Sequence, residues 1–162
     1  MEKAVWKTET QKDMEYWFTK YLQPNAYVLQ RGIISNMRPK FINCSYDEKT
    51  LTLEFDAAQW QLNPEGILHG GMLVTAFDTT FGSLCHYYAK ENVINTIEIS
   101  TTFLKPVPAG CKYYITVKAN HVGKTITSMT AQAYLSETDL LLATASASFI
   151  RLERKITNII PK

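Results

Sequence analysis

The chain has 162 residues, 46% of them hydrophobic and 20% charged, and its net charge is +2. These values predict one globular domain and exclude a disordered chain, while no apolar run is long enough to span a bilayer. The basic residues are scattered, which argues against a nucleic-acid partner. The N-terminus lacks the apolar stretch of a signal peptide. The three cysteines are an odd number without C-x-x-C spacing, which is typical of reduced thiols. We therefore expect a cytoplasmic protein.

The first predicted element is a helix that ends before Pro24. Its apolar residues recur at helical spacing and form one stripe: Met14, Trp17, Phe18, Tyr21 and Leu22. A β-hairpin should follow, with strands at 42–46 and 51–55 around the polar turn 47–50.

The middle of the chain predicts one long helix from Gly70 to about Tyr88. It is apolar on nearly all sides, so other elements should enclose it. Four strands joined by polar turns are expected after it, at 97–103, 113–119, 126–135 and 141–152. Short turns imply an antiparallel sheet. The expected fold class is therefore α+β, an antiparallel sheet wrapped around one long helix, with an extra N-terminal helix.

The candidate chemistry lies where a loop becomes the long helix. His69-Gly70-Gly71 leaves uncovered backbone N–H groups at the helix start, where the macrodipole adds partial positive charge, as an oxyanion hole requires. Asp78 follows two turns later on an apolar face, where an unpartnered carboxylate is costly, so it is a candidate general base. Each feature alone also has an ordinary structural explanation. Their occurrence on one helix favours a catalytic site.

The segment Asn63-x-x-Gly66-x-Leu68-His69-Gly70-Gly71, followed by Asp78, resembles the active-site signature of hotdog-fold acyl-CoA thioesterases. It is most similar to the phenylacetate-pathway and 4-hydroxybenzoyl-CoA branch, and the resemblance extends from about residue 33 to 152. This resemblance implies a hotdog domain at 31–155, with a helical extension at 1–30 and a tail at 156–162.

The resemblance also implies residue roles. The Gly70 N–H would polarise the thioester carbonyl, and Asp78 of a partner subunit would activate water or attack directly to give a mixed anhydride. His69 and Asn63 would orient the thioester and the water, with the Thr96 hydroxyl near that water. Three further residues would contact the substrate: Gly71, Phe81 and, at the nucleotide end of CoA, Lys124. Taken by itself, Lys124 is better explained as a solvated turn residue.

The implied partners are a small acyl-CoA substrate and a second copy of the chain, as a homodimer or a dimer of dimers. No cofactor is expected, because CoA is part of the substrate, and no metal site is expected, because His69, His86 and His121 are far apart in sequence. The Gly-x-Ser-x-Gly, Rossmann and P-loop motifs are absent. Two alternatives stay open: a hotdog hydratase or dehydratase, and a non-catalytic acyl-ligand binding protein.

Overall fold

The computed structural model describes residues 8–156. Its helical elements are α1 (Gln11–Tyr21), η1 (Tyr27–Leu29), α2 (Gly32–Met37), η2 (Gln59–Gln61) and α3 (Gly70–Ala89). Its strands are β1 (Lys40–Ser45), β2 (Thr50–Asp56), β3 (Asn92–Phe103), β4 (Lys112–Val122), β5 (Ile126–Leu135) and β6 (Leu141–Lys155). None of the helices within these residues is long and apolar enough to cross a membrane.

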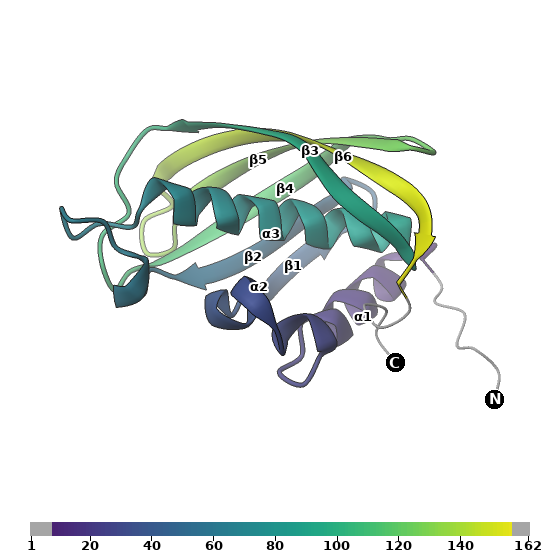
Figure 1. Cartoon of the computed structure of the whole chain (residues 1–162), viewed down its shortest axis with the longest axis horizontal. Helices are drawn as coiled ribbons and strands as arrows, with labels where there is room; N and C mark the ends of the chain where they lie inside the picture. Colours follow the sequence, from purple (N-terminus) through teal and green to yellow (C-terminus); the bar gives the residue numbers. More distant parts are fainter. Residues whose placement is uncertain (1–7, 157–162) are drawn as a thin grey trace.

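The six strands form one antiparallel sheet in the order β1-β2-β4-β5-β6-β3, and α3 lies along its inner face (Figure 1). The expected architecture is confirmed, including the 70–88 helix and the first hairpin. Alternation explains the layers: in β4, Tyr113, Ile115 and Val117 are fully buried against the core, whereas Lys118 points to solvent. The sheet curls around α3, which is why that helix buries apolar side chains on several sides.

The N-terminal helix shares this hydrophobic core. Thr10 caps α1 by accepting a hydrogen bond from the backbone of Asp13. Trp17 and Phe18 are fully buried, and their rings lie 5.9 and 5.7 Å from the ring of Tyr87 near the end of α3. The boundary between residues 30 and 31 stays a prediction. Residues 1–7 of the predicted extension and all but residue 156 of the predicted tail lie outside the described residues.

The start of β3 was predicted wrongly, at residue 97, whereas the strand begins at Asn92. Irregularities in its pairing with β6, between Asn92 and Ile94 and between Thr96 and Glu98, interrupt the alternation that identifies a strand. The short helices η1, α2 and η2 were also not predicted, because they have too few turns to show a periodic apolar pattern.

His86, near the end of α3, should make the free energy of unfolding sensitive to acid. Burial lowers the pKa of His86 from 6.5 to about 4. Because the unfolded chain binds this proton at a higher pH than the folded chain does, stability should fall as the pH falls from 6.5 to about 4. The expected loss is on the order of 3 kcal/mol.

Urea unfolding at neutral pH and at the lower end of this window measures the effect. The His86→Gln variant, which has no titratable group at this position, should lose less stability over the same window. An equal loss in both proteins would show that His86 is not responsible.

Candidate active site

The first turn of α3 has one backbone donor that remains unpaired. The Gly71 N–H donates to Nδ1 of His69 at 2.9 Å, and the Met72 and Leu73 N–H groups donate to the His69 carbonyl at 2.8 and 3.2 Å. The Gly70 N–H has no acceptor among the described residues. It therefore remains available to an external oxygen, at the helix end that favours negative charge.

His69 is held as the cap of α3. Since its Nδ1 accepts from the Gly71 N–H, the proton of the neutral ring is assigned to Nε2. A Cβ on Gly71 would lie 3.1 Å from this Nδ1, so the glycine leaves room for the ring to fold over the helix start. The exposed His69 ring can thus donate through Nε2 to a ligand beside Gly70.

Asn63 organises the loop that leads into the helix. Its Oδ1 accepts hydrogen bonds from the backbone N–H groups of Glu65 and Ile67, at 3.1 and 3.2 Å. Gly66 completes the turn with a φ of +75°, a left-handed conformation that favours glycine. The side-chain oxygen of Asn63 therefore shapes the loop, and its predicted role in orienting the thioester and the water stays a prediction.

Gln61 anchors the same loop, and sequence reasoning missed it. Its side chain is only 2% exposed, with Oε1 accepting from the Ala58 N–H at 2.8 Å and Nε2 donating to Sδ of Met37 at 2.9 Å. Its carbonyl accepts from the His69 N–H at 2.9 Å. Gln61 thus connects α2 to the residue that caps α3. A glutamine in a polar, loop-like segment carries no sequence signal that would reveal this burial.

Asp78 and Thr96 meet in the structure. The Thr96 hydroxyl, on β3, donates to Oδ1 of Asp78 at 2.8 Å. Asp78 is half-buried, at the edge of the apolar face of α3 that Phe81 and Cys85 bury, so it is less enclosed than the sequence predicted. The irregularity between Thr96 and Glu98 places Thr96 on the side of the sheet that faces α3.

Gly70 and Asp78 do not meet within one chain. They are eight residues apart on a continuous helix, which corresponds to about 12 Å along its axis. A thioester carbonyl bound at the Gly70 N–H therefore lies out of reach of Asp78 of the same protomer.

Phe103 lies beside the helix start and was also missed. Its ring is close enough that a Cβ on Gly70 would lie 3.3 Å from its Cζ, although 53% of the side chain is exposed. Both residues line a cavity of about 320 Å³, together with Asn63, Leu73 and Lys105. The predicted oxyanion donor thus opens onto a cavity between α3 and the end of β3.

Residues 65–142, from just before the His-Gly-Gly segment to the start of β6, match the family model of the Thioesterase superfamily. Over this segment, the chain is similar to the thioesterase superfamily. No curated protein matches the sequence.

Solved structures share the fold of this chain. The Escherichia coli PaaI protein from the phenylacetic acid degradation operon is 18% identical, with a TM-score of 0.72 over 87% of this chain and 99% of that one. A phenylacetic acid degradation-related protein of Ralstonia eutropha JMP134 is 21% identical, with a TM-score of 0.72 over 83% and 98%. A Streptococcus mutans UA159 protein, bound to acetyl-CoA, is 17% identical, with a TM-score of 0.64 over 73% and 91%. The hotdog fold is thus confirmed.

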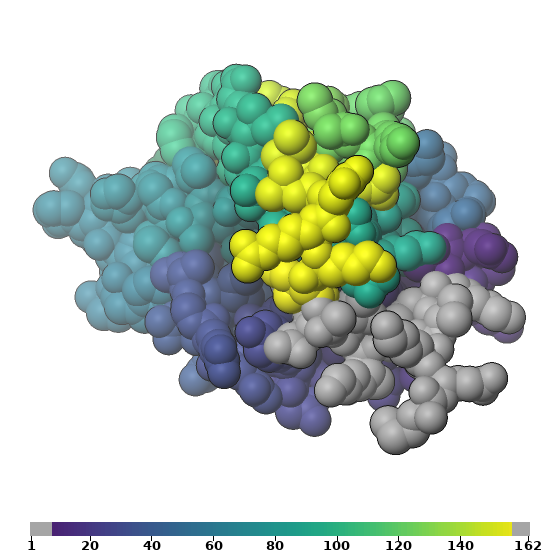
Figure 2. Space-filling model, turned by 45° about the vertical axis from the view of Figure 1, so that its right-hand side comes forward, coloured from purple at the N-terminus to yellow at the C-terminus, as the bar shows by residue number. Residues whose placement is uncertain are grey.

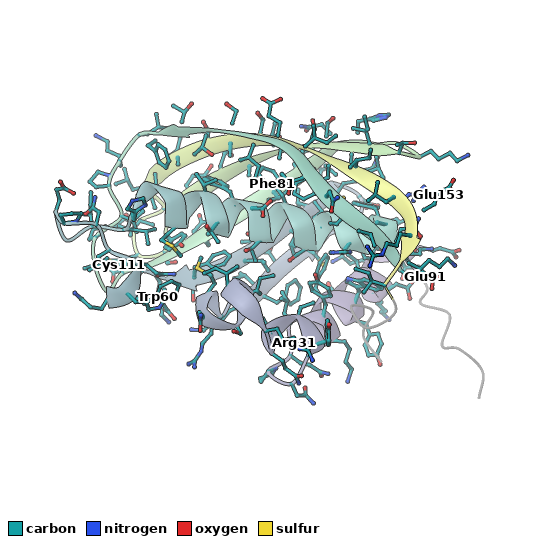
Figure 3. The ribbon with its side chains drawn as sticks, in the orientation of Figure 1. Arg31, Trp60, Phe81, Glu91, Cys111 and Glu153 are labelled. Atoms are coloured by element: carbon teal, nitrogen blue, oxygen red, sulfur yellow. The ribbon has the colours of Figure 1, made fainter. Side chains whose placement is uncertain are left out.

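Two predicted substrate contacts of this chain lie away from Gly70. Phe81 is fully buried under the sheet and packs on Phe77 and Phe149, with ring centroids 6.3 and 6.4 Å away (Figure 3). Lys124 is exposed in the β4–β5 turn, at the end of the sheet far from the start of α3 (Figure 1). Their roles stay predictions, and that of Lys124 requires a second protomer.

A larger cavity, about 570 Å³, lies on the outer face of the sheet. Hydroxyl and amide side chains line it, among them Ser100, Thr116, Thr130, Gln132 and Thr144. No residue of the His-Gly-Gly segment contributes to it. Among residues 8–156, no three His, Cys, Asp or Glu side chains gather as metal ligands would.

Proposed function

We propose that this chain hydrolyses an acyl-CoA thioester to the free acid and CoA. The observation that carries the proposal is the unpaired Gly70 N–H at the start of α3. Asp78 lies on the same helix, and the Thr96 hydroxyl of β3 holds its carboxylate. The match of residues 65–142 to the Thioesterase superfamily supports the reaction type. The acetyl-CoA bound to the Streptococcus mutans protein of the same fold supports CoA as the thiol.

The 12 Å separation favours a site shared by two protomers. Strand β3 is an edge strand of the sheet and is 12 residues long. Glu98 is its one charged residue, and the side chains of Ile97 and Phe103 are exposed. A long, weakly charged edge strand is suited to pairing with another strand. Because Phe103 lies by Gly70 and Thr96 by Asp78, two β3 strands paired antiparallel about a two-fold axis would bring Gly70 of one protomer towards Asp78 of the other.

In this arrangement the reaction follows from the groups present. The Gly70 N–H donates to the carbonyl oxygen, and the negative charge develops on that oxygen in the tetrahedral intermediate. The partner's Asp78 takes a proton from water as the water oxygen bonds to the carbonyl carbon. The intermediate collapses, the C–S bond breaks, and the CoA sulfur leaves with the proton that Asp78 holds. Thr96 keeps one carboxylate oxygen in place, and the other faces the water.

The test is thiol release from a panel of acyl-CoA esters with aliphatic chains of increasing length and with aromatic rings. We expect hydrolysis of at least one class, with matched release of free acid and CoA. Binding of acyl-CoA without any thiol release would favour the non-catalytic binding protein. Addition of water to an enoyl-CoA would instead indicate a hydratase.

A further inference from the structure

The N-terminal layer, formed by α1, η1 and α2, makes up the lower side of the molecule outside the sheet (Figures 1 and 2). Its buried side chains, which include Met14, Trp17, Phe18 and Met37, belong to the common core. The exposed side chains of the layer must therefore face away from the core, towards solvent. No residue of the His-Gly-Gly segment belongs to this layer.

Asp13 and Glu15 lie in the first half of α1, but the rest of this layer has no acidic residue. Between Tyr16 and Tyr46 the chain has four basic residues and none of its 15 acidic ones. Lys40 pairs with Asp56 at 3.5 Å. Lys20, Arg31 and Arg38 form no ion pair with a carboxylate among the described residues. From Tyr16 onwards, the layer therefore presents positive charge although the whole chain is nearly neutral.

Apolar and aromatic side chains lie among these cations. Tyr27 is 38% exposed and Ile33 is 46% exposed. The guanidinium of Arg31 lies 5.4 Å from the centre of the Tyr27 ring, and the ammonium of Lys20 lies 5.6 Å from that of Tyr16. Figure 3 shows Arg31 at the lower side, well separated from the acidic Glu91 and Glu153. We call Tyr16, Lys20, Tyr27, Arg31, Ile33 and Arg38 the basic–aromatic face.

We propose that the basic–aromatic face docks the protein on the surface of an anionic lipid bilayer. Tyrosine and arginine have apolar bodies and polar tips, so they can lie at the level of the headgroups, and Ile33 can enter the acyl boundary. The cations are interleaved with exposed apolar side chains, whereas a nucleic-acid site has cations in a stripe along the phosphates. Each cation near such a surface strengthens binding roughly fivefold at low salt. The proposal does not depend on the hydrolytic activity.

Co-sedimentation of the full chain with vesicles tests the proposal. We expect binding to vesicles of equimolar phosphatidylglycerol and phosphatidylcholine, weakening with added salt, and little binding to phosphatidylcholine alone. The double variant Arg31→Glu, Arg38→Glu should bind the anionic vesicles at least tenfold more weakly. Tyr27→Ser with Ile33→Ser should also weaken binding, while leaving the charge unchanged.

The matched control is Lys49→Glu with Arg154→Glu. It makes the same charge change at exposed positions outside the face, and Lys49, like Arg38, has a left-handed backbone. The control should bind like the wild type. Equal weakening in the control would show that the attraction is non-specific, which would overturn the proposal. Absence of binding to anionic vesicles would also overturn it. A further contrary outcome is that the wild type binds duplex DNA in a salt-sensitive manner and does not bind vesicles. If the Arg31→Glu, Arg38→Glu variant lost that DNA binding, the face would be a nucleic-acid site.

Discussion

Replacing Asp78 by asparagine should lower the kcat of thioester hydrolysis by about a hundredfold or more, with KM changed little. Asparagine has the same shape and can still accept the hydrogen bond that the Thr96 hydroxyl donates at 2.8 Å. It cannot take a proton from water. The loss therefore falls on the transition state and leaves substrate binding largely intact, and it corresponds to about 2.7 kcal/mol of activation free energy.

Asp139→Asn is the matched control for this substitution. Asp139 also accepts a hydrogen bond from a hydroxyl, that of Tyr114, at 2.8 Å, but it lies in the turn between β5 and β6. Its amide variant should retain wild-type kcat. Hydrolysis by Asp78→Asn at the wild-type rate would remove Asp78 from the mechanism, and an equal fall in both variants would point to a general loss of structure.

Mixing two inactive variants should restore activity if the site is shared. Gly70 is the first residue of α3, where proline is tolerated, so Gly70→Pro removes the N–H donor without breaking the helix. A dimer of one Gly70→Pro chain and one Asp78→Asn chain keeps one site with both groups intact. Random exchange of protomers should then give about a quarter of wild-type activity, since half of the dimers are mixed and each has one of two sites.

Gly70→Ala separates the lost donor from the added bulk. It keeps the N–H but introduces a Cβ that would lie 3.3 Å from the ring of Phe103, which must then shift. It should be more active than Gly70→Pro. Denaturing and refolding the two inactive proteins together allows the exchange, with each refolded alone as the baseline. A mixture no more active than the baseline would contradict a site shared between two protomers.

Local sequence patterns were enough to predict most of the fold. The helical spacing of apolar residues located α1 and α3, and the alternation of Tyr113, Ile115 and Val117 located β4. The interval at which side chains return to the same face of a helix or strand depends only on local backbone geometry, so it is visible in a single sequence. The His-Gly-Gly segment was placed at a helix start for the same reason. The structure showed in addition that the Gly70 N–H is the donor left unpaired there.

Contacts between distant residues were decided by the tertiary structure alone. By strict alternation Thr96 would face outward with Ser100, but the irregularity before Glu98 turns it towards Asp78. The burial of Gln61 between α2 and the helix cap is likewise a product of packing. So is the approach of Phe103 to Gly70.

The sequence by itself thus determined that Gly70 lies at an exposed helix start and that Asp78 lies two turns later on the same helix. The hydroxyl that holds Asp78 and the cavity beside Gly70 depend on how β3 crosses α3. No local pattern encodes that crossing, because it results from the packing of segments that are far apart in the chain.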